Sequence, residues 1–185
     1  VGHGGADPGM IGVGGLEEKG INLEIALKVR DVLEKKGFTV IMTREQDEGL
    51  YDQDSRNQKA QDMQRRIALI KECKPVLCVS IHQNSYVSGE SRGAQVFYYK
   101  QSAEGKKLAG IIQRHIVNEA DTTNKRVEKA DSTYYLLLHT NVPAVIVECG
   151  FLSNPEEAGR LNSDSYQQKI AGSIYNGLME YLTNQ

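Results

Sequence analysis

Cysteine is scarce in this sequence of 185 residues. Only Cys73, Cys78 and Cys149 are present, and no two of them form a Cys-x-x-Cys pair. An odd number of cysteines cannot be fully paired within one chain, so we expect no framework of structural disulfides. Free cysteine packs as a small hydrophobic residue, and each of the three lies in or beside an apolar stretch. The sequence therefore predicts buried free thiols.

Long apolar runs and an excess of charge are also missing. A helix that spans a bilayer needs about 20 consecutive apolar residues, and no such run occurs. The first residues do not form a secretory signal, so we expect any export signal to lie upstream of residue 1. Lys and Arg total 22 while Asp and Glu total 24. This balance gives no electrostatic reason to expect a nucleic acid as partner, and it favours a substrate held in a cleft.

Glycine is plentiful near the start, but the spacings that bind nucleotides are absent. A dinucleotide fingerprint that begins at Gly12 needs glycine where Glu17 stands. A Walker loop that begins at Gly15 needs lysine after Gly20, where Ile21 stands. We therefore expect no nucleotide site, and no serine nucleophile of the α/β-hydrolase kind.

Apolar residues recur with periods that predict helices alternating with strands. We expect strands at 38–42, 76–81, 94–99, 134–138 and 144–147, and helices at 21–33, 63–71, 102–116, from 155, and 165–182. This alternation predicts a single α/β domain over residues 1–185, with a twisted, mostly parallel sheet flanked by helices on both faces. Because the chain opens on a loop, we expect a first strand upstream of residue 1. The long polar loop at 43–62 is expected to border the site.

Four ionisable residues lie where predicted strands end or loops begin: His3, Glu18, His82 and Glu148. Ligands bind at the carboxyl ends of strands in open α/β sheets. Two imidazoles and a carboxylate at that edge, with one position left for water, have the composition of a catalytic zinc site. Glu148 follows an apolar strand, where a carboxylate can act as a general base.

Each of these residues also has a simpler interpretation. A histidine at a strand end is more often a hydrogen-bonded core or rim residue than a metal ligand. Glu18 is equally well explained as an acidic residue that stabilises the N-terminus of the following helix. For Glu148 the simpler interpretation is weaker, because a carboxylate between two apolar stretches needs a partner or a function.

Several motifs, in order along nearly the whole chain, resemble those of the zinc-dependent N-acetylmuramoyl-L-alanine amidases. They are Gly2-His3-Gly4-Gly5-Ala6-Asp7-Pro8-Gly9, Glu18-Lys19 with Asn22-Leu23, Thr43-Arg44, Ser80-Ile81-His82-Gln83-Asn84, and Val147-Glu148-Cys149-Gly150-Phe151-Leu152-Ser153-Asn154. The resemblance implies a zinc-exopeptidase-like fold and hydrolysis of the amide between N-acetylmuramic acid and L-alanine of peptidoglycan stem peptides. It implies one catalytic Zn²⁺ held by His3, Glu18 and His82, and Glu148 as the catalytic acid. The family pattern places Lys directly after the ligand, and Lys19 therefore selects Glu18 over Glu17.

A closer resemblance concerns the branch of the family found in endospore formers, which acts in making spore-cortex muramic-δ-lactam. It depends on Ser55-Arg56, residues 62–66, Tyr134-Tyr135-Leu136-Leu137 and residues 165–169. The resemblance implies peptidoglycan as partner, a possible activating protein, and a location outside the cytoplasmic membrane, in the cell wall or the forespore intermembrane space. Two alternatives stay open: a zinc exopeptidase that acts on free peptides, and a wall-binding module without catalytic activity.

Three further residues are candidates for binding substrate. Asn84 and Arg66 match family positions, where a polar side chain orients a substrate carbonyl or braces the loop. His139 ends a predicted strand and is placed to border the cleft. His115 lies on a predicted helix among Ile111 and Ile112 and is expected to be structural.

Overall fold

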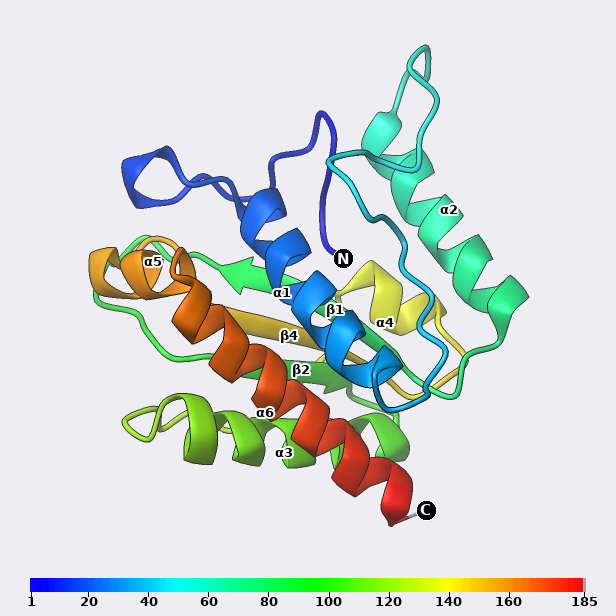
Figure 1. Ribbon diagram of the computed structural model, residues 1–185. Coiled ribbons are helices and arrows are strands. Elements are labelled where there is room, and N and C mark those ends of the chain that lie inside the picture. Colours follow the sequence, from blue (N-terminus) through cyan, green and yellow to red (C-terminus); the bar gives the residue numbers. More distant parts are fainter. Residues whose placement is uncertain (185) are drawn as a thin grey trace.

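The computed structural model describes residues 1–184 and contains a four-stranded sheet in the order β1-β4-β2-β3 (Figure 1). The strands are β1 (Cys78–Asn84), β2 (Gln95–Tyr99), β3 (Lys129–Asp131) and β4 (Ala144–Phe151). β1 runs parallel to β4, and β2 runs parallel to β3, but β2 and β4 are antiparallel. The predicted α/β class is confirmed. The sheet is mixed, because its two parallel pairs of strands run in opposite directions.

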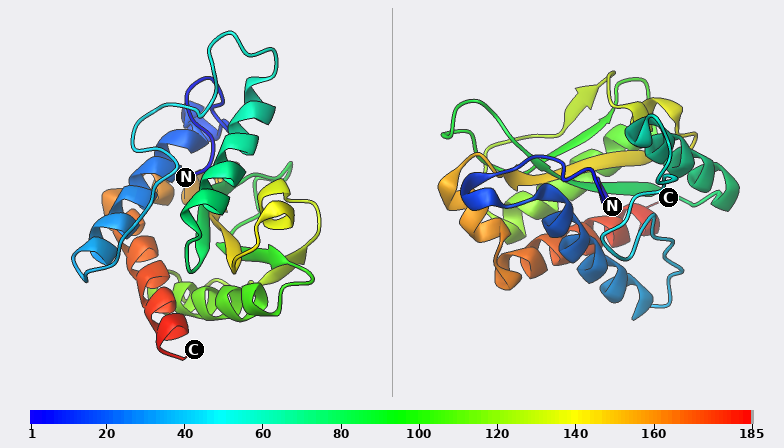
Figure 2. Two further views of the ribbon diagram at one scale, coloured as in Figure 1. Left: turned by 90° about the vertical axis from the view of Figure 1, so that its right-hand side faces the viewer. Right: turned by 90° about the horizontal axis from the view of Figure 1, so that it is seen from above.

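Helices cover both faces of this sheet, as predicted. One face is covered by α1 (Glu18–Glu34), α3 (Ala103–His115) and α6 (Asp164–Thr183). The other carries α2 (Gln58–Cys73) and the short α4 (Tyr135–His139), and Figure 2 shows the two layers from the side and from above. The short elements η1 (Val13–Gly15), η2 (Ile116–Ala120) and α5 (Pro155–Leu161) complete the described fold.

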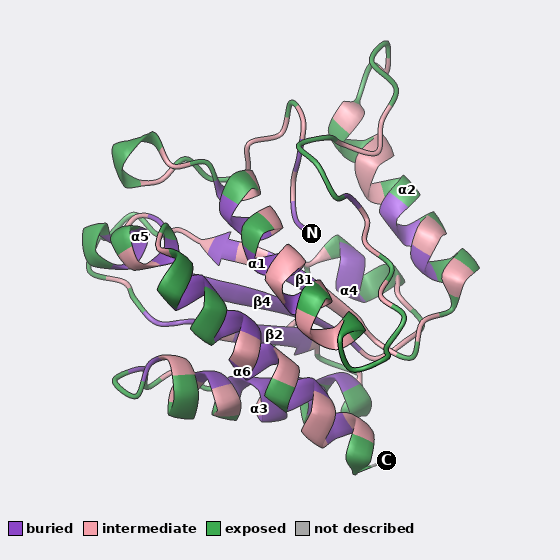
Figure 3. Cartoon of the chain, viewed as in Figure 1, coloured by how far each residue is buried: buried purple, intermediate pink, exposed green. Residues whose placement is uncertain are grey.

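Alternation along β4 divides the core into two parts. Val145 and Val147 pack into the larger cluster with α1, α3 and α6, whereas Ala144 and Ile146 pack with residues of α2 and α4. All eight residues of β4 are buried, as expected of a central strand covered on both sides (Figure 3). Because successive side chains alternate between faces, Glu148 points to the side of α2 and α4.

Two predicted strands are wrong. Residues 38–42 join no ladder in the described part of the chain, since residues 1–3 lie between this segment and β1: the Gly2 amide donates to the Ile81 carbonyl at 3.0 Å. Residues 135–138 lie in the helix α4 instead of a strand, and Tyr134 is the N-cap of that helix. A run of five apolar residues fits the period of a helix as well as that of a strand. The turn at Asp131, whose carboxylate accepts the Tyr134 amide at 2.9 Å, directly precedes the helix.

The remaining predicted helices are present, although some begin or end at other residues than expected. The caps at Ser102 and Asn154 are formed, and each side chain accepts backbone amides of the helix that follows. Helix α2 begins five residues earlier than predicted, capped by Asn57. The three cysteines are free, as expected, but only Cys149 is buried as predicted, and Cys73 and Cys78 are half-buried. Among the described residues, no helix is long and apolar enough to cross a membrane.

Candidate active site

The glycine-rich start of the chain lets His3 approach its neighbours. A Cβ on Gly2 would lie 2.3 Å from the ring of His82, and one on Gly9 would lie 2.5 Å from Glu18 Oε2. Gly9 also has φ +70°, a conformation that favours glycine. The glycines therefore serve close packing around the ionisable side chains.

Glu18 is the first residue of α1 and only 2% exposed. Its Oε2 accepts the Met10 amide at 2.9 Å. Its Oε1 accepts the Gln83 amide at 3.0 Å and the Asn22 side-chain amide at 3.1 Å. Burial alone would raise the pKa of Glu18, but hydrogen bonds from His3 and His82 outweigh it and hold the pKa far below its ordinary value. The side chain is thus a fixed, ionised carboxylate.

Both predicted histidine ligands face this carboxylate. Nε2 of His3 lies 3.2 Å from Glu18 Oε2, and Nδ1 of His82 lies 2.9 Å from Glu18 Oε1. The two rings meet edge to face, with centroids 5.0 Å apart. One ligand atom from each of the three residues lies within 4.8 Å of the other two, a spacing at which all three can hold one metal ion. Two imidazoles and one carboxylate form the donor set of a catalytic zinc site, so these residues fit the metal.

Asp7 fixes the orientation of His3. Its Oδ2 lies 2.8 Å from Nδ1 of His3, which leaves Nε2 directed at Glu18. A carboxylate behind a metal-binding histidine sets the tautomer and the ring position. Burial lowers the pKa of His3, but the contacts with Glu18 and Asp7 outweigh it and raise the pKa in the absence of metal. Burial lowers the pKa of His82, which favours the neutral form that binds metal.

Glu148 lies beside His82, because the two residues are paired across the parallel strands β1 and β4. Both positions were expected to follow their strands, and both lie within them. Glu148 Oε1 accepts the Tyr134 hydroxyl at 3.2 Å, while the buried Oε2 has no hydrogen-bond partner among the described residues. Burial, and secondly the charge of Glu18, raise the pKa of Glu148 to about 8.

The 43–57 segment and Arg66 brace the loop that carries His3. Arg44 donates to the His3 carbonyl at 2.7 Å and to the Lys19 carbonyl at 2.7 Å. The buried Arg66 donates to the His3 carbonyl at 2.9 Å and pairs with Asp62. Of the two roles expected for Arg66, these contacts support bracing of the loop. A contact between Arg66 and the substrate carbonyl stays a prediction.

The other tentative candidates stand outside the metal cluster. Asn84 is the last residue of β1, and its side chain accepts the Ser85 amide at 2.8 Å. His139 is exposed at the end of α4, where its ring stacks on Tyr135 with centroids 3.9 Å apart. His115 is held between Glu119 and Glu180.

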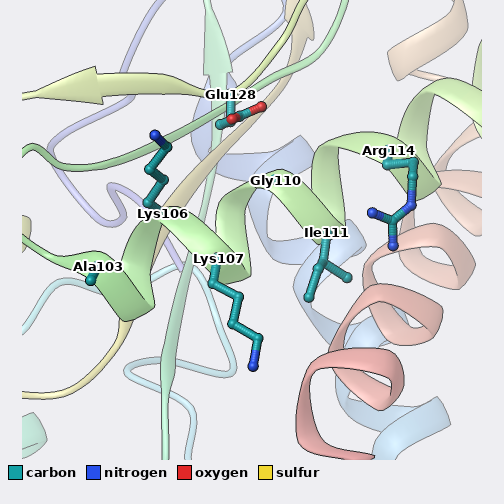
Figure 4. A pocket seen from close by; sticks show the side chains of 7 residues that line it. All are labelled: Ala103, Lys106, Lys107, Gly110, Ile111, Arg114 and Glu128. Atoms are coloured by element: carbon teal, nitrogen blue, oxygen red, sulfur yellow. The ribbon is translucent and has the colours of Figure 1, made fainter. Parts of the chain in front are cut away.

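A hollow of about 100 Å³ adjoins the metal cluster and is lined by His3, His82, Tyr134 and residues of α2. A second, open hollow lies on the outside of α3 (Figure 4) and is lined partly by Lys106, and none of its residues belongs to the metal cluster.

The spacing Gly-x-Ser-x-Gly does occur at 89–93, but Ser91 lies in the loop between β1 and β2. A nucleophile elbow is a strand-to-helix turn, whereas Ser91 lies in a connection between two strands.

Comparisons with known proteins show which family this chain is similar to. The family model described as N-acetylmuramoyl-L-alanine amidase (Amidase_3) matches residues 1–180. The germination-specific N-acetylmuramoyl-L-alanine amidase of Bacillus subtilis is 40% identical over 187 residues, which cover 100% of this chain and 78% of that protein. The structure of the CwlD amidase from Clostridioides difficile in complex with the GerS lipoprotein is 39% identical, with a TM-score of 0.97 over 100% of this chain and 96% of that one. The amidase AmiC2 of Nostoc punctiforme is 31% identical, with a TM-score of 0.84 over 98% and 93% of the two chains.

Proposed function

This chain belongs to the N-acetylmuramoyl-L-alanine amidase family, and we propose that His3, Glu18 and His82 hold a catalytic zinc ion beside the general base Glu148. Its activity is hydrolysis of the amide bond between N-acetylmuramic acid and the L-alanine of peptidoglycan stem peptides. The observation that supports the assignment of roles is the convergence of three ligand atoms within 4.8 Å, next to a carboxylate with one unpartnered buried oxygen.

When bound, zinc supplies Lewis-acid activation of the attacking water and of the lactyl carbonyl. Asp7 keeps His3 oriented, and the three hydrogen bonds from Met10, Asn22 and Gln83 keep Glu18 in place. Glu148 takes the proton of the water on Oε2 and returns it to the departing amine of L-alanine. Burial and the charge of Glu18 raise the pKa of Glu148 in the metal-free protein, and the charge of a bound zinc ion would favour the ionised form that accepts the proton. No covalent bond forms between protein and substrate.

Two rival functions differ in their products or in their residues. A non-catalytic wall-binding module would have lost a ligand or the base, yet all four residues are present and close together. A zinc exopeptidase would release single amino acids from peptide ends. The products of digestion therefore separate the amidase from the exopeptidase.

The test is digestion of purified peptidoglycan, with the products identified by mass spectrometry. We expect intact stem peptides that begin with free L-alanine, together with glycan strands that carry N-acetylmuramic acid without peptide. Glu148→Gln protein serves as the matched control and should release both at least about a hundredfold more slowly. Release of single amino acids from the peptide ends would favour the exopeptidase instead.

Within the family we propose a role in the spore cortex. The 40% identity to the germination-specific amidase supports it, as does the fold similarity to CwlD. We place the activity outside the cytoplasmic membrane, in the cell wall or the forespore intermembrane space. The CwlD structure contains the GerS lipoprotein, which supports a protein partner for this chain as well. Faster peptide release from cortex than from vegetative wall is the expected result, and equal rates would count against the cortex role.

A further inference from the structure

The two oxygens of the Glu148 carboxylate have different surroundings. Oε1 accepts the hydroxyl of Tyr134 at 3.2 Å, whereas Oε2 is buried without a hydrogen-bond partner in the 1–184 segment. The terminal torsion of a glutamate is broad, so packing alone does not fix the plane of the carboxylate. A donor on one oxygen fixes that plane and leaves the other oxygen free for the reaction.

Tyr134 is itself firmly held. It precedes α4, and the Asp131 carboxylate accepts the amide of Tyr134 at 2.9 Å and the amide of Thr133 at 2.6 Å. The Tyr134 ring packs edge to face against Phe97 of β2, with centroids 5.5 Å apart. The backbone turn and the ring contact together direct the hydroxyl at Glu148. The same tyrosine lines the hollow that adjoins His3 and His82.

We propose that Tyr134 is a positioning residue for amide hydrolysis, which holds Glu148 Oε1 so that Oε2 faces the water to be activated. This inference rests on the proposed role of Glu148 as general base. The hydroxyl keeps its proton throughout, because it serves only as a donor to the carboxylate. Misplacement of a reacting group by about 1 Å can cost on the order of a hundredfold in rate, so loss of this hydrogen bond should lower turnover by about 10- to 100-fold.

The test compares two tyrosines on soluble muropeptides. Tyr134→Phe removes the hydroxyl and keeps the ring that packs on Phe97. Tyr175→Phe is the matched control, because Tyr175 lies on α6, which covers the opposite face of the sheet, and it does not line the hollow beside the metal cluster. We expect Tyr134→Phe to lower kcat by about 10- to 100-fold, with KM within about twofold, and with zinc content and melting temperature unchanged. The control should stay within about twofold of wild type in kcat.

A double variant separates positioning from an independent effect. If Tyr134 acts through Glu148, adding Tyr134→Phe to Glu148→Gln should lower kcat no further, because effects of residues that act as a unit are not additive. An additive loss would overturn the inference, and so would wild-type kcat in Tyr134→Phe or a loss of zinc or melting temperature in it. Undiminished kcat in Glu148→Gln would instead overturn the proposed base itself.

Discussion

Replacing Glu148 with glutamine changes the chemistry of the site and leaves its shape nearly intact. The substitution conserves volume and keeps an oxygen that can accept the Tyr134 hydroxyl, which is 3.2 Å from Oε1. It removes the base that takes the proton of the water. General acid–base assistance is worth about two to four orders of magnitude in rate, so we expect kcat to fall at least about a hundredfold.

The same variant should change the stability of the metal-free protein in a pH-dependent way. The pKa of Glu148 is about 8 in the folded chain, against an ordinary value of 4.5. The folded state therefore holds this proton more firmly, and the resulting stabilisation is complete below pH 4.5 and disappears as pH rises to about 8. At 1.36 kcal/mol per pH unit, the wild type loses about 3 kcal/mol from this group between pH 4.5 and pH 7. The variant lacks this group and therefore does not show this part of the loss.

One preparation of each protein is enough to test both effects. Zinc content, kcat, and the free energy of unfolding in urea after metal removal are measured at pH 5 and pH 7. We expect normal zinc content and low kcat in Glu148→Gln. We also expect the metal-free variant to gain stability relative to the metal-free wild type as pH rises. The difference in their free energies of unfolding should shift in favour of the variant by about 2 to 3 kcal/mol between pH 5 and pH 7. Lost zinc would make Glu148 a ligand. Undiminished kcat would remove it from the mechanism, and a gap independent of pH would refute the burial argument.

Three further substitutions, two of them with a matched control, test the metal cluster. Glu18→Ala should abolish zinc binding, measured by calorimetric titration, whereas Glu17→Ala should leave it near wild type; the opposite result would put the ligand one residue earlier. Asp7→Ala should weaken zinc affinity by about 10- to 100-fold because it frees the His3 ring, and unchanged affinity would refute that role. Gly9→Ala should displace Glu18 and impair zinc binding, whereas Gly14→Ala, with a similar φ of +72° but nothing within 4 Å of its added Cβ, should not; equal effects of the two would contradict the close-packing argument.

The candidate site residues could be proposed from the sequence because each lies in a short motif or at the end of an apolar run. His82 and Glu148 end apolar runs, and alternation along paired strands then places them on the same face. Glycines around His3 indicated a loop, although only the structure shows that they permit contact with Glu18 and His82. Asp7 was visible within the first motif, but its hydrogen bond to His3 was not predicted.

Interactions that depend on tertiary packing were not predictable from sequence patterns. Tyr134 was assigned to a strand because a short apolar run has no distinct period, and its contact with Glu148 exists only once the chain turns at Asp131 into α4. Likewise, the 43–62 loop was expected to border the site, but nothing in its polar composition showed that Arg44 would donate to the His3 carbonyl.

Zinc content and turnover, measured together on the wild-type protein, test the central claim most directly. The account predicts one zinc ion per chain by elemental analysis. It also predicts release of stem peptides from peptidoglycan that stops in chelator and returns when zinc is added back. No bound zinc at saturating metal, or full peptide release in the presence of chelator, would contradict the assignment of His3, Glu18 and His82 as a catalytic zinc site.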